Sequence, residues 1–138
     1  MARQEGTPYR GRSSSQRDAI AQAAEAMPGA FSAEELLGSV RQREPGVGAA
    51  TVYRALKAMR DAGFVEAVGT REGAVVYARC RGTGHHHHLV CTACGAVAEA
   101  DCELDRVLER VASASGYTVT SHELALRGVC PACRKKGA

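Results

Sequence analysis

Histidine and cysteine are concentrated in one short stretch of the chain, residues 80–94. Seven of its fifteen residues are His or Cys, and it holds four of the five histidines in the sequence. These residue types are the ones that bind transition metals. If the tract is extended, its side chains alternate between two faces. We therefore predict that it donates a histidine pair to each of two metal sites, His85 with His87 on one face and His86 with His88 on the other.

Two CxxC pairs predict a further site that is built from thiolates. Cys91 and Cys94 form the first pair, and Cys130 and Cys133 form the second, with 35 residues between them. Each short loop lets two sulfur atoms reach one cation, and two such loops complete a tetrahedral four-thiolate zinc site. A redox CxxC is the rival interpretation, and an iron site of the rubredoxin type would use the same ligands. Because the protein closes all four positions, we expect this site to be structural rather than catalytic.

Three further residues are candidates for the two histidine sites or remain outside them. Cys80 precedes a Gly-Thr-Gly segment and can join the histidine pair of one face, while His122 can join the other pair. One thiolate with two or three nitrogen or oxygen donors suits Zn(II) better than Fe(II) or Mn(II). Cys102 has no patterned partner, and we interpret it as an ordinary free thiol.

Composition places the chain among globular proteins of ordinary size. Its 138 residues, 45% of them apolar, fit one domain or two small ones. The sequence has no apolar run near 18 residues and begins with a polar, basic segment, so we expect no membrane span and no secretory signal. In the reducing cytoplasm that this predicts, six cysteines are metal ligands rather than disulfides. The net charge of +3 comes largely from arginines in the first 17 residues, which favours an anionic partner there.

The elements that must position these ligands begin with three helices. After a flexible basic arm (1–14), apolar spacing predicts a helix from about Ser15, which Pro28-Gly29 ends. Ser32 and Glu35 form a capping box that opens a second helix. A third helix is expected over residues 49–62, with Gly63 ending it. Its Arg54 and Lys57 lie off the apolar stripe.

Strands are expected in the rest of the chain. Two short strands (64–68 and 74–78), separated by a turn, follow the third helix, and three helices with a β-hairpin are the order of a winged helix-turn-helix. Beyond the first CxxC pair, the pattern predicts a strand (96–100), a helix that Gly116 ends, and a long strand (117–126) that carries His122. The fold class is therefore α+β, with a small C-terminal αβ unit that a second copy would help to stabilise.

Specific motifs give the chain a resemblance to a known family. Thr51-Val52-Tyr53-Arg54 followed by Asp61-Ala62-Gly63, and His85-His86-His87-His88-Leu89-Val90-Cys91-x-x-Cys94-Gly95, resemble the Fur superfamily of bacterial metal-responsive repressors over about residues 12 to 134. The chain is most similar to the zinc-uptake regulators of that family, of the actinobacterial kind. The resemblance implies a winged-helix DNA-binding domain (1–81), a hinge and metal-ligand tract (82–88) and an αβ dimerisation domain (89–138). It also implies a homodimer that binds palindromic operators when it is loaded with metal.

The resemblance also implies particular ligand sets. The structural zinc site matches Cys91, Cys94, Cys130 and Cys133. The regulatory hinge zinc site matches Glu66, Cys80, His86 and His88. An additional zinc site matches His85, His87, Asp105 and His122, with Glu103 as the alternative carboxylate. One structural zinc and one or two regulatory zinc ions are thus expected in each chain.

The expected function is zinc-responsive repression of zinc uptake and homeostasis genes through double-stranded operator DNA. No enzyme activity, small-molecule substrate or membrane is expected to be involved. Repressors of the same family that sense iron, manganese, nickel or peroxide are the alternative. A zinc hydrolase and a metal-storage protein explain less of the sequence, because the first lacks its motifs and the second leaves the helix-turn-helix unexplained. The DNA contacts that we expect come from Arg12, Arg17, Thr51, Tyr53, Arg54 and Lys57.

Overall fold

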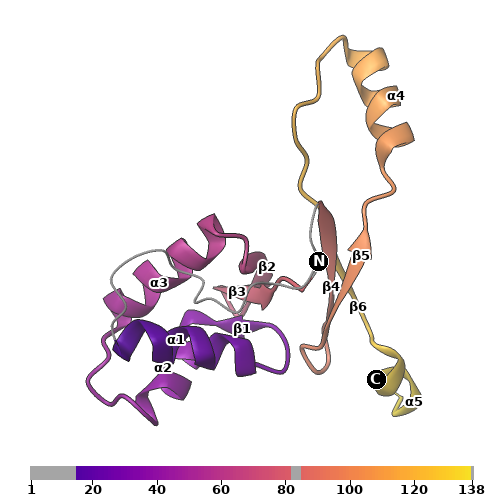
Figure 1. The fold of residues 1–138 in the computed structure, drawn as a ribbon. Helices are drawn as coiled ribbons and strands as arrows, with labels where there is room; N and C mark the ends of the chain where they lie inside the picture. Colours follow the sequence, from indigo (N-terminus) through magenta and orange to yellow (C-terminus); the bar gives the residue numbers. More distant parts are fainter. Residues whose placement is uncertain (1–14, 82–84, 138) are drawn as a thin grey trace.

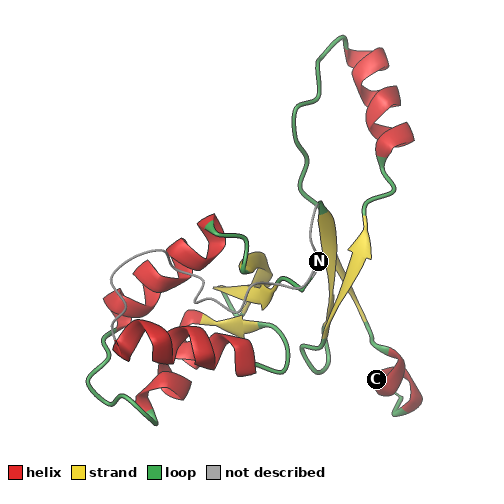
Figure 2. Cartoon of the chain, viewed as in Figure 1, coloured by secondary structure: helices red, strands yellow, loops and turns green. Residues whose placement is uncertain are grey.

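The computed structural model describes residues 15–81 and 85–137. Three helices and a small sheet form one part, and a second sheet with two helices forms the other (Figures 1 and 2). The basic arm (1–14) and the Gly-Thr-Gly segment (82–84) lie outside the described residues. No helix in the described part of the chain is long and apolar enough to cross a membrane.

The three predicted helices are present. They are α1 (Ser15–Ala26), α2 (Ala33–Arg41) and α3 (Ala49–Asp61). The predicted capping box opens α2, because the Glu35 backbone N–H donates to Ser32 Oγ at 3.1 Å and the Ser32 N–H donates to Glu35 Oε2 at 2.7 Å. Both bonds satisfy amides that a helix start leaves without partners.

Apolar side chains from these helices make one core. The apolar spacing expected of each helix is confirmed where its side chains are buried: Ile20, Leu36, Val40, Val52, Leu56 and Met59. Phe31 of the short strand β1 (Phe31–Ser32) closes the core against Tyr77. Full burial of each large side chain stabilises the fold by roughly 1.5–3 kcal/mol. Because α3 turns its apolar side to this core, its opposite side is exposed.

The hairpin after α3 is present, but its turn is shorter than predicted. Strands β2 (Val65–Arg71) and β3 (Ala74–Arg79) pair antiparallel, and β1 pairs with the other edge of β3. Only Glu72 and Gly73 connect them, both with positive φ (52° and 81°), as a tight hairpin turn requires. The expected five-residue turn (69–73) was wrong because residues 69–71 continue the pairing past a bulge at Ala67 and Gly69.

The second part is a three-stranded sheet with β4 in the middle. Strand β4 (His86–Cys91) pairs antiparallel with β5 (Val97–Asp101) and parallel with β6 (Ala125–Gly128). Helix α5 (Pro131–Lys135) follows β6. The predicted long strand (117–126) was wrong, because the described structure has a strand only from Ala125. The pairing of β6 with β4 begins at Ala125, opposite His88, and an extended segment is a strand only where a neighbouring strand satisfies its backbone.

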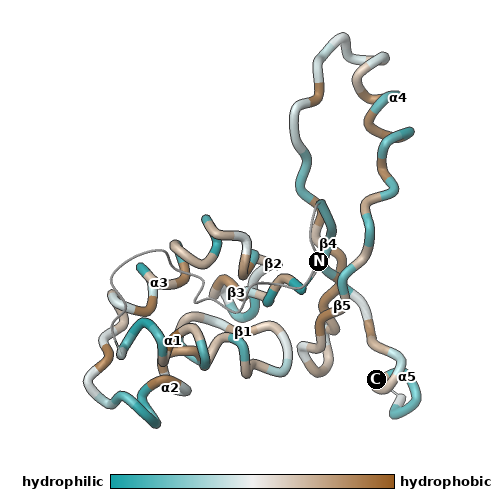
Figure 3. Tube along the Cα trace, viewed as in Figure 1, coloured by the Kyte–Doolittle hydropathy of each residue, from teal (hydrophilic) through white to brown (hydrophobic). Residues whose placement is uncertain are grey.

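Helix α4 (Asp105–Ser115) projects away from the sheet, and Gly116 caps its C-terminus, where the sequence predicted that the helix would stop. Gly116 adopts the left-handed φ of 75° that favours glycine at a helix C-terminus. No residue of α4 is buried, although apolar and polar residues alternate along it (Figure 3). Its valines Val107 and Val111 are about half exposed.

The two parts touch through backbone as well as side chains. The Ala30 N–H donates to the Gly95 carbonyl at 2.9 Å. A Cβ at Gly29 would lie 2.4 Å from that same oxygen, so only glycine permits this approach. Around it, Val68 and Val76 of the hairpin lie in a small apolar cluster with Val90 and Val97 of the second sheet.

Candidate metal centres

Strand β4 separates the histidine tract into two faces, as its alternation predicts. The rings of His85 and His87 pack edge to face with centroids 4.8 Å apart. The rings of His86 and His88 do the same on the other side, also at 4.8 Å. His87 and His88 are buried. One strand therefore presents two separate pairs of imidazole nitrogens.

The four cysteines of the CxxC pairs gather at the end of β4, whose last residue is Cys91. Cys91, Cys94, Cys130 and Cys133 place their sulfur atoms within 4.8 Å of one another. The Cys94 and Cys130 sulfurs are 3.8 Å apart. Tetrahedral zinc with Zn–S bonds of about 2.3 Å requires sulfurs roughly 3.8 Å apart. The donor set and its spacing therefore fit a closed zinc site.

Backbone amides polarise this group. The pKa of the Cys91 thiol is lowered to about 6, because its sulfur accepts hydrogen bonds from backbone N–H groups. The N–H of Cys130 has the largest effect and that of Cys94 the next largest. The hydrogen bond of the Cys133 thiol to Cys130 is the largest of the effects that raise the pKa of Cys133 to about 12. The Cys91 sulfur therefore loses its proton easily, whereas the Cys133 sulfur keeps its proton until a cation displaces it.

The predicted hinge ligands also come together. Glu66 of β2, Cys80 after β3, and His86 and His88 of β4 place one donor atom each within 4.8 Å of one another. His88 Nδ1 is 3.1 Å from the Glu66 carboxylate. The other ring nitrogen of His88, Nε2, is buried and has no hydrogen-bond partner in the described structure. Burying a polar atom in this way is costly unless it gains a partner, and a cation would provide one.

A second carboxylate, which sequence reasoning did not find, borders the hinge group. Glu99 of β5 lies opposite His88 in the strand register. Its Oε1 atom is 3.7 Å from His88 Nε2 and 3.9 Å from His86 Nε2, and it also accepts a hydrogen bond from the Arg81 backbone N–H. Glu99 can thus orient the histidines or supply an oxygen donor. Only the pairing of β4 with β5 places it there.

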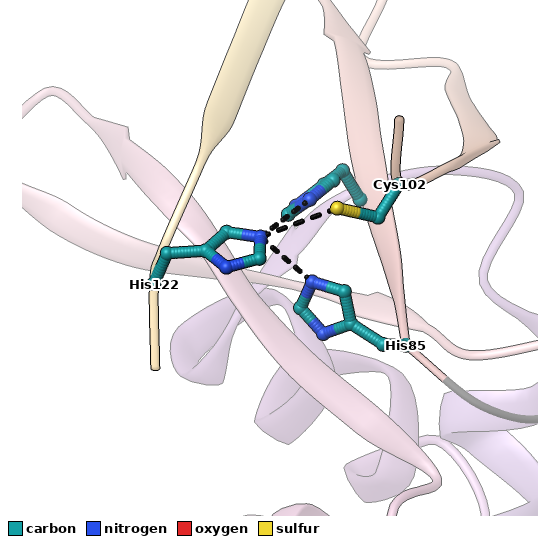
Figure 4. Close-up of side chains that lie close together, drawn as sticks. His85, Cys102 and His122 are labelled. Carbon is teal, nitrogen blue, oxygen red and sulfur yellow. Dashed lines mark hydrogen bonds between the residues drawn. The ribbon is translucent and has the colours of Figure 1, made fainter. Parts of the chain in front are cut away.

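The third group differs from the expected one in one ligand. His85, His87 and His122 come together, and the fourth member is Cys102 rather than Asp105 (Figure 4). Asp105 is exposed at the first residue of α4, and Glu103 is exposed as well. Neither carboxylate belongs to the group that the described residues form. Cys102, which the sequence led us to interpret as an ordinary free thiol, lies in this group, and its sulfur is 3.3 Å from His122 Nε2.

Burial favours the neutral form of one imidazole on each face of β4, His87 on one face and His88 on the other. Burial, followed by the neighbouring His85 and His122, lowers the pKa of His87. Burial likewise lowers the pKa of His88 on the opposite face. Neutral imidazole is the form that coordinates metal. Both faces of β4 therefore present histidine in the protonation state that a cation needs.

The candidate DNA contacts lie on the exposed side of α3. Tyr53 is 60% exposed, and Arg54 donates a hydrogen bond to Thr51 Oγ1 at 3.2 Å. Lys57 forms an ion pair with Asp61 at 3.2 Å, and both side chains are largely in solvent. Arg17 is exposed on α1, whereas Arg12 lies outside the described residues. The core uses the opposite side of α3, so these side chains are available to a partner.

The chain is similar to known proteins in both sequence and fold. The sequence model of the Ferric uptake regulator family matches residues 10–127. A zinc uptake regulation protein of Mycobacterium tuberculosis is 40% identical over 124 residues, 89% of this chain and 95% of that protein. A ferric uptake regulation protein of Neisseria meningitidis is 34% identical over 78% of this chain and 74% of its own length. Among solved structures, a zinc uptake regulator complexed with zinc and DNA superposes with a TM-score of 0.74 and 28% identity, covering 90% of this chain and 84% of that one.

Proposed function

Because the chain belongs to the ferric uptake regulator family, whose members regulate transcription and are not enzymes, we propose that it is a zinc-responsive repressor. It binds palindromic operator DNA as a zinc-loaded homodimer and controls genes of zinc uptake and homeostasis in the cytoplasm. The observation that carries this proposal is the hinge group, in which a buried cysteine joins two histidines and one carboxylate. The likeness to zinc uptake regulators in sequence and in fold supports it.

The hinge donors favour zinc over harder cations. Cys80 is only 4% exposed, and its sulfur faces Glu66, His86 and His88. A thiolate among nitrogen and oxygen donors suits Zn(II), whereas Fe(II) and Mn(II) favour nitrogen and oxygen alone. The sequence has no histidine before residue 85, so the helical part of the chain cannot supply an imidazole to the hinge. With the four-cysteine site and the third group, the expected content is one structural and one or two regulatory zinc ions in each chain.

The arrangement of the first three helices supports DNA binding. In a winged helix-turn-helix, the third helix enters the major groove and its first turns meet the base edges. Thr51, Tyr53 and Arg54 lie in the first turns of α3 and outside the core. An arginine can bind guanine or phosphate, and a tyrosine hydroxyl can bind phosphate. Lys57 and Arg17 add positive charge that can contact the phosphate backbone of the DNA.

Unsatisfied surfaces in the second part support a homodimer. Helix α4 buries none of its residues in this chain, and Val107 and Val111 remain about half exposed. Tyr117, at the start of the segment that was expected to be a strand, is 78% exposed. A second copy would cover the valines of α4 and give the extended segment a strand to pair with. Two copies would also present two α3 helices to the two halves of a palindrome.

The hinge group connects the part that reads DNA with the part that dimerises. Glu66 and Cys80 belong to the first part, and His86 and His88 to the second. When bound, zinc supplies short coordinate bonds to donors from both parts. The four side chains then hold the two parts in one relative position, which selects the conformers that fit both half-sites. Coupling between a metal site and a DNA site is typically about 1–3 kcal/mol.

An iron or manganese regulator is the second candidate function. Glu99 is the observation that favours it, because a second carboxylate beside His86 and His88 would enrich the hinge in oxygen donors. The likeness to ferric uptake regulation proteins points the same way. Against it stands Cys80, whose sulfur lies within the group.

A DNA-binding titration tests the proposal. Protein that retains its tightly held metal is mixed with the DNA upstream of its own gene and titrated separately with buffered Zn(II), Fe(II) and Mn(II). Binding that appears with zinc alone, at very low free metal, is the expected result. Equal or better activation by iron or manganese would support the second candidate, and no binding with any metal would refute both on this DNA.

A further inference from the structure

We propose that Cys102, and not a carboxylate, is the fourth ligand of the third metal site. The site is then a thiolate with three imidazoles, suited to zinc or a similar borderline-soft divalent cation. The inference rests on the proposed function only in assuming that the chain handles metal. Its evidence is the cluster of His85, His87, Cys102 and His122.

Hydrogen bonding alone cannot account for this cluster. His122 Nε2 lies 2.9 Å from His85 Nε2, 3.2 Å from His87 Nε2 and 3.3 Å from Cys102 Sγ (Figure 4). A single ring nitrogen either donates one proton or accepts through one lone pair, so it can satisfy only one of these three contacts well. A cation between the four atoms would satisfy all of them at once.

The spacing fits a tetrahedral site. With Zn–N bonds of about 2.0 Å and a Zn–S bond of about 2.3 Å, neighbouring donors lie roughly 3.3 Å apart for two nitrogens and roughly 3.5 Å for nitrogen and sulfur. The three distances at His122 are 2.9, 3.2 and 3.3 Å, so small movements would bring the donors to these values. The cluster on the opposite face of β4 likewise includes a cysteine sulfur, that of Cys80.

The strand register explains why Cys102 is present. In the β4–β5 ladder, His86 pairs with Asp101 and His87 pairs with Ala100. If this register continues by one residue, Cys102 is opposite His85. Residues opposite each other in an antiparallel pair share a face, so Cys102 faces the same side as His85 and His87. Asp105 comes three residues later, in the first turn of α4, and its side chain is exposed.

This ligand set determines which metals bind. Three imidazoles and a thiolate favour Zn(II) and Co(II) over Mn(II), Mg(II) and Fe(II), which prefer nitrogen and oxygen donors. With a carboxylate in place of the sulfur, the harder cations would compete better. The proposal therefore predicts a site that selects among divalent cations by their softness as well as by their preferred coordination geometry.

Cobalt spectroscopy on the full-length protein tests the proposal directly. The background variant is Cys80→Ser with zinc retained in the four-cysteine site, so that the hinge contributes no thiolate. Co(II) added to this variant is expected to give a sulfur-to-cobalt charge-transfer band in the near ultraviolet, together with the visible bands of a tetrahedral ion. Adding Cys102→Ser should abolish the charge-transfer band and weaken cobalt binding at this site by roughly tenfold or more. Adding Asp105→Asn instead should leave both unchanged.

The opposite pattern would overturn the proposal. A charge-transfer band that survives Cys102→Ser would show that the sulfur ligand is another cysteine, and cobalt binding that is lost in Asp105→Asn would assign the site to the carboxylate; either result refutes the proposal. Circular dichroism and retained zinc show whether each variant is folded, and Cys102→Ala serves if the serine variant is not. The measurement needs no DNA. A protein that shows the Cys102-dependent band but binds no operator would therefore refute the proposed function and leave this inference intact.

Discussion

Replacing Cys80 by serine should separate metal sensing from folding. Cys80 is buried between the two parts of the chain, and its backbone N–H donates to the Phe64 carbonyl at 2.8 Å. Serine keeps that backbone bond and nearly the same volume. Its hydroxyl can donate to the Glu66 carboxylate in the same cluster. We therefore expect the free energy of unfolding to change by no more than about 1 kcal/mol, and a folded dimer to persist.

The effect on DNA binding should be much larger. The hinge cluster offers one sulfur among four donors, and this sulfur is the donor that suits zinc most specifically. Losing it weakens the link between Glu66 in the first part and His86 and His88 in the second. If most of the coupling of about 1–3 kcal/mol depends on that link, zinc-dependent affinity for the operator falls roughly 5- to 150-fold.

Operator titrations at fixed free zinc measure this change, with the wild type and the variant compared at one salt concentration. Thermal unfolding and a sedimentation measurement show whether the dimer is intact. Glu66→Gln is the matched control, because it removes a charge from the same cluster but keeps the thiolate, and a smaller loss is expected from it. Full zinc-dependent binding by Cys80→Ser would show that the assignment of the hinge site is wrong.

Three other substitutions test the remaining elements. Cys91→Ser should abolish cooperative thermal unfolding, because the four-cysteine site contributes on the order of 10 kcal/mol when metal binds; a cooperative, folded variant would contradict this. Gly29→Ala places a Cβ 2.4 Å from the Gly95 oxygen, so the contact between the two parts must open and operator affinity should fall several-fold, with Gly38→Ala, where a Cβ meets nothing, as control. Val111→Glu puts a charge on the exposed side of α4 and should shift the protein toward monomer in sedimentation, whereas a dimer of unchanged stability would exclude α4 from the interface.

The features predicted correctly from sequence are those that local chemistry determines. The capping box of Ser32 and Glu35 requires only a spacing of three residues, and it is present with both hydrogen bonds. The two faces of the histidine tract follow from the alternation of any extended strand. Cys91 and Cys94 lie near each other because a CxxC loop is short. In each case the interacting residues are close in the chain or share a strong pattern.

The features that sequence reasoning missed depend on pairing between distant strands. Glu99 and Cys102 reach the metal clusters only through the register of β4 with β5, which residue types do not reveal. The long strand predicted from Tyr117 failed for a related reason. An extended segment is a strand only where a neighbour satisfies its backbone, and within the described residues the pairing with β4 begins at Ala125. The resemblance to the family pointed to Asp105, but the ladder brings Cys102 to the same cluster.

Strand β4 makes the three clusters depend on one another. Its last residue, Cys91, belongs to the four-cysteine group and lies opposite Gly128, and the Thr92 N–H donates to the Gly128 carbonyl at 2.8 Å. Closing that group therefore fixes the pairing of β4 with β6. The same pairing sets His88 opposite Ala125, three residues after His122.

The four-cysteine site thus does more than hold the end of the sheet. If it opens, β6 is free to move along β4, and His122 leaves the position where it meets His85 and Cys102. His86 and His88 would still lie on one face of β4, but the position of β4 relative to Glu66 would no longer be fixed. We therefore expect a metal in the four-cysteine group, at one end of β4, to be a condition for metal binding at the other two groups and to bind first during folding.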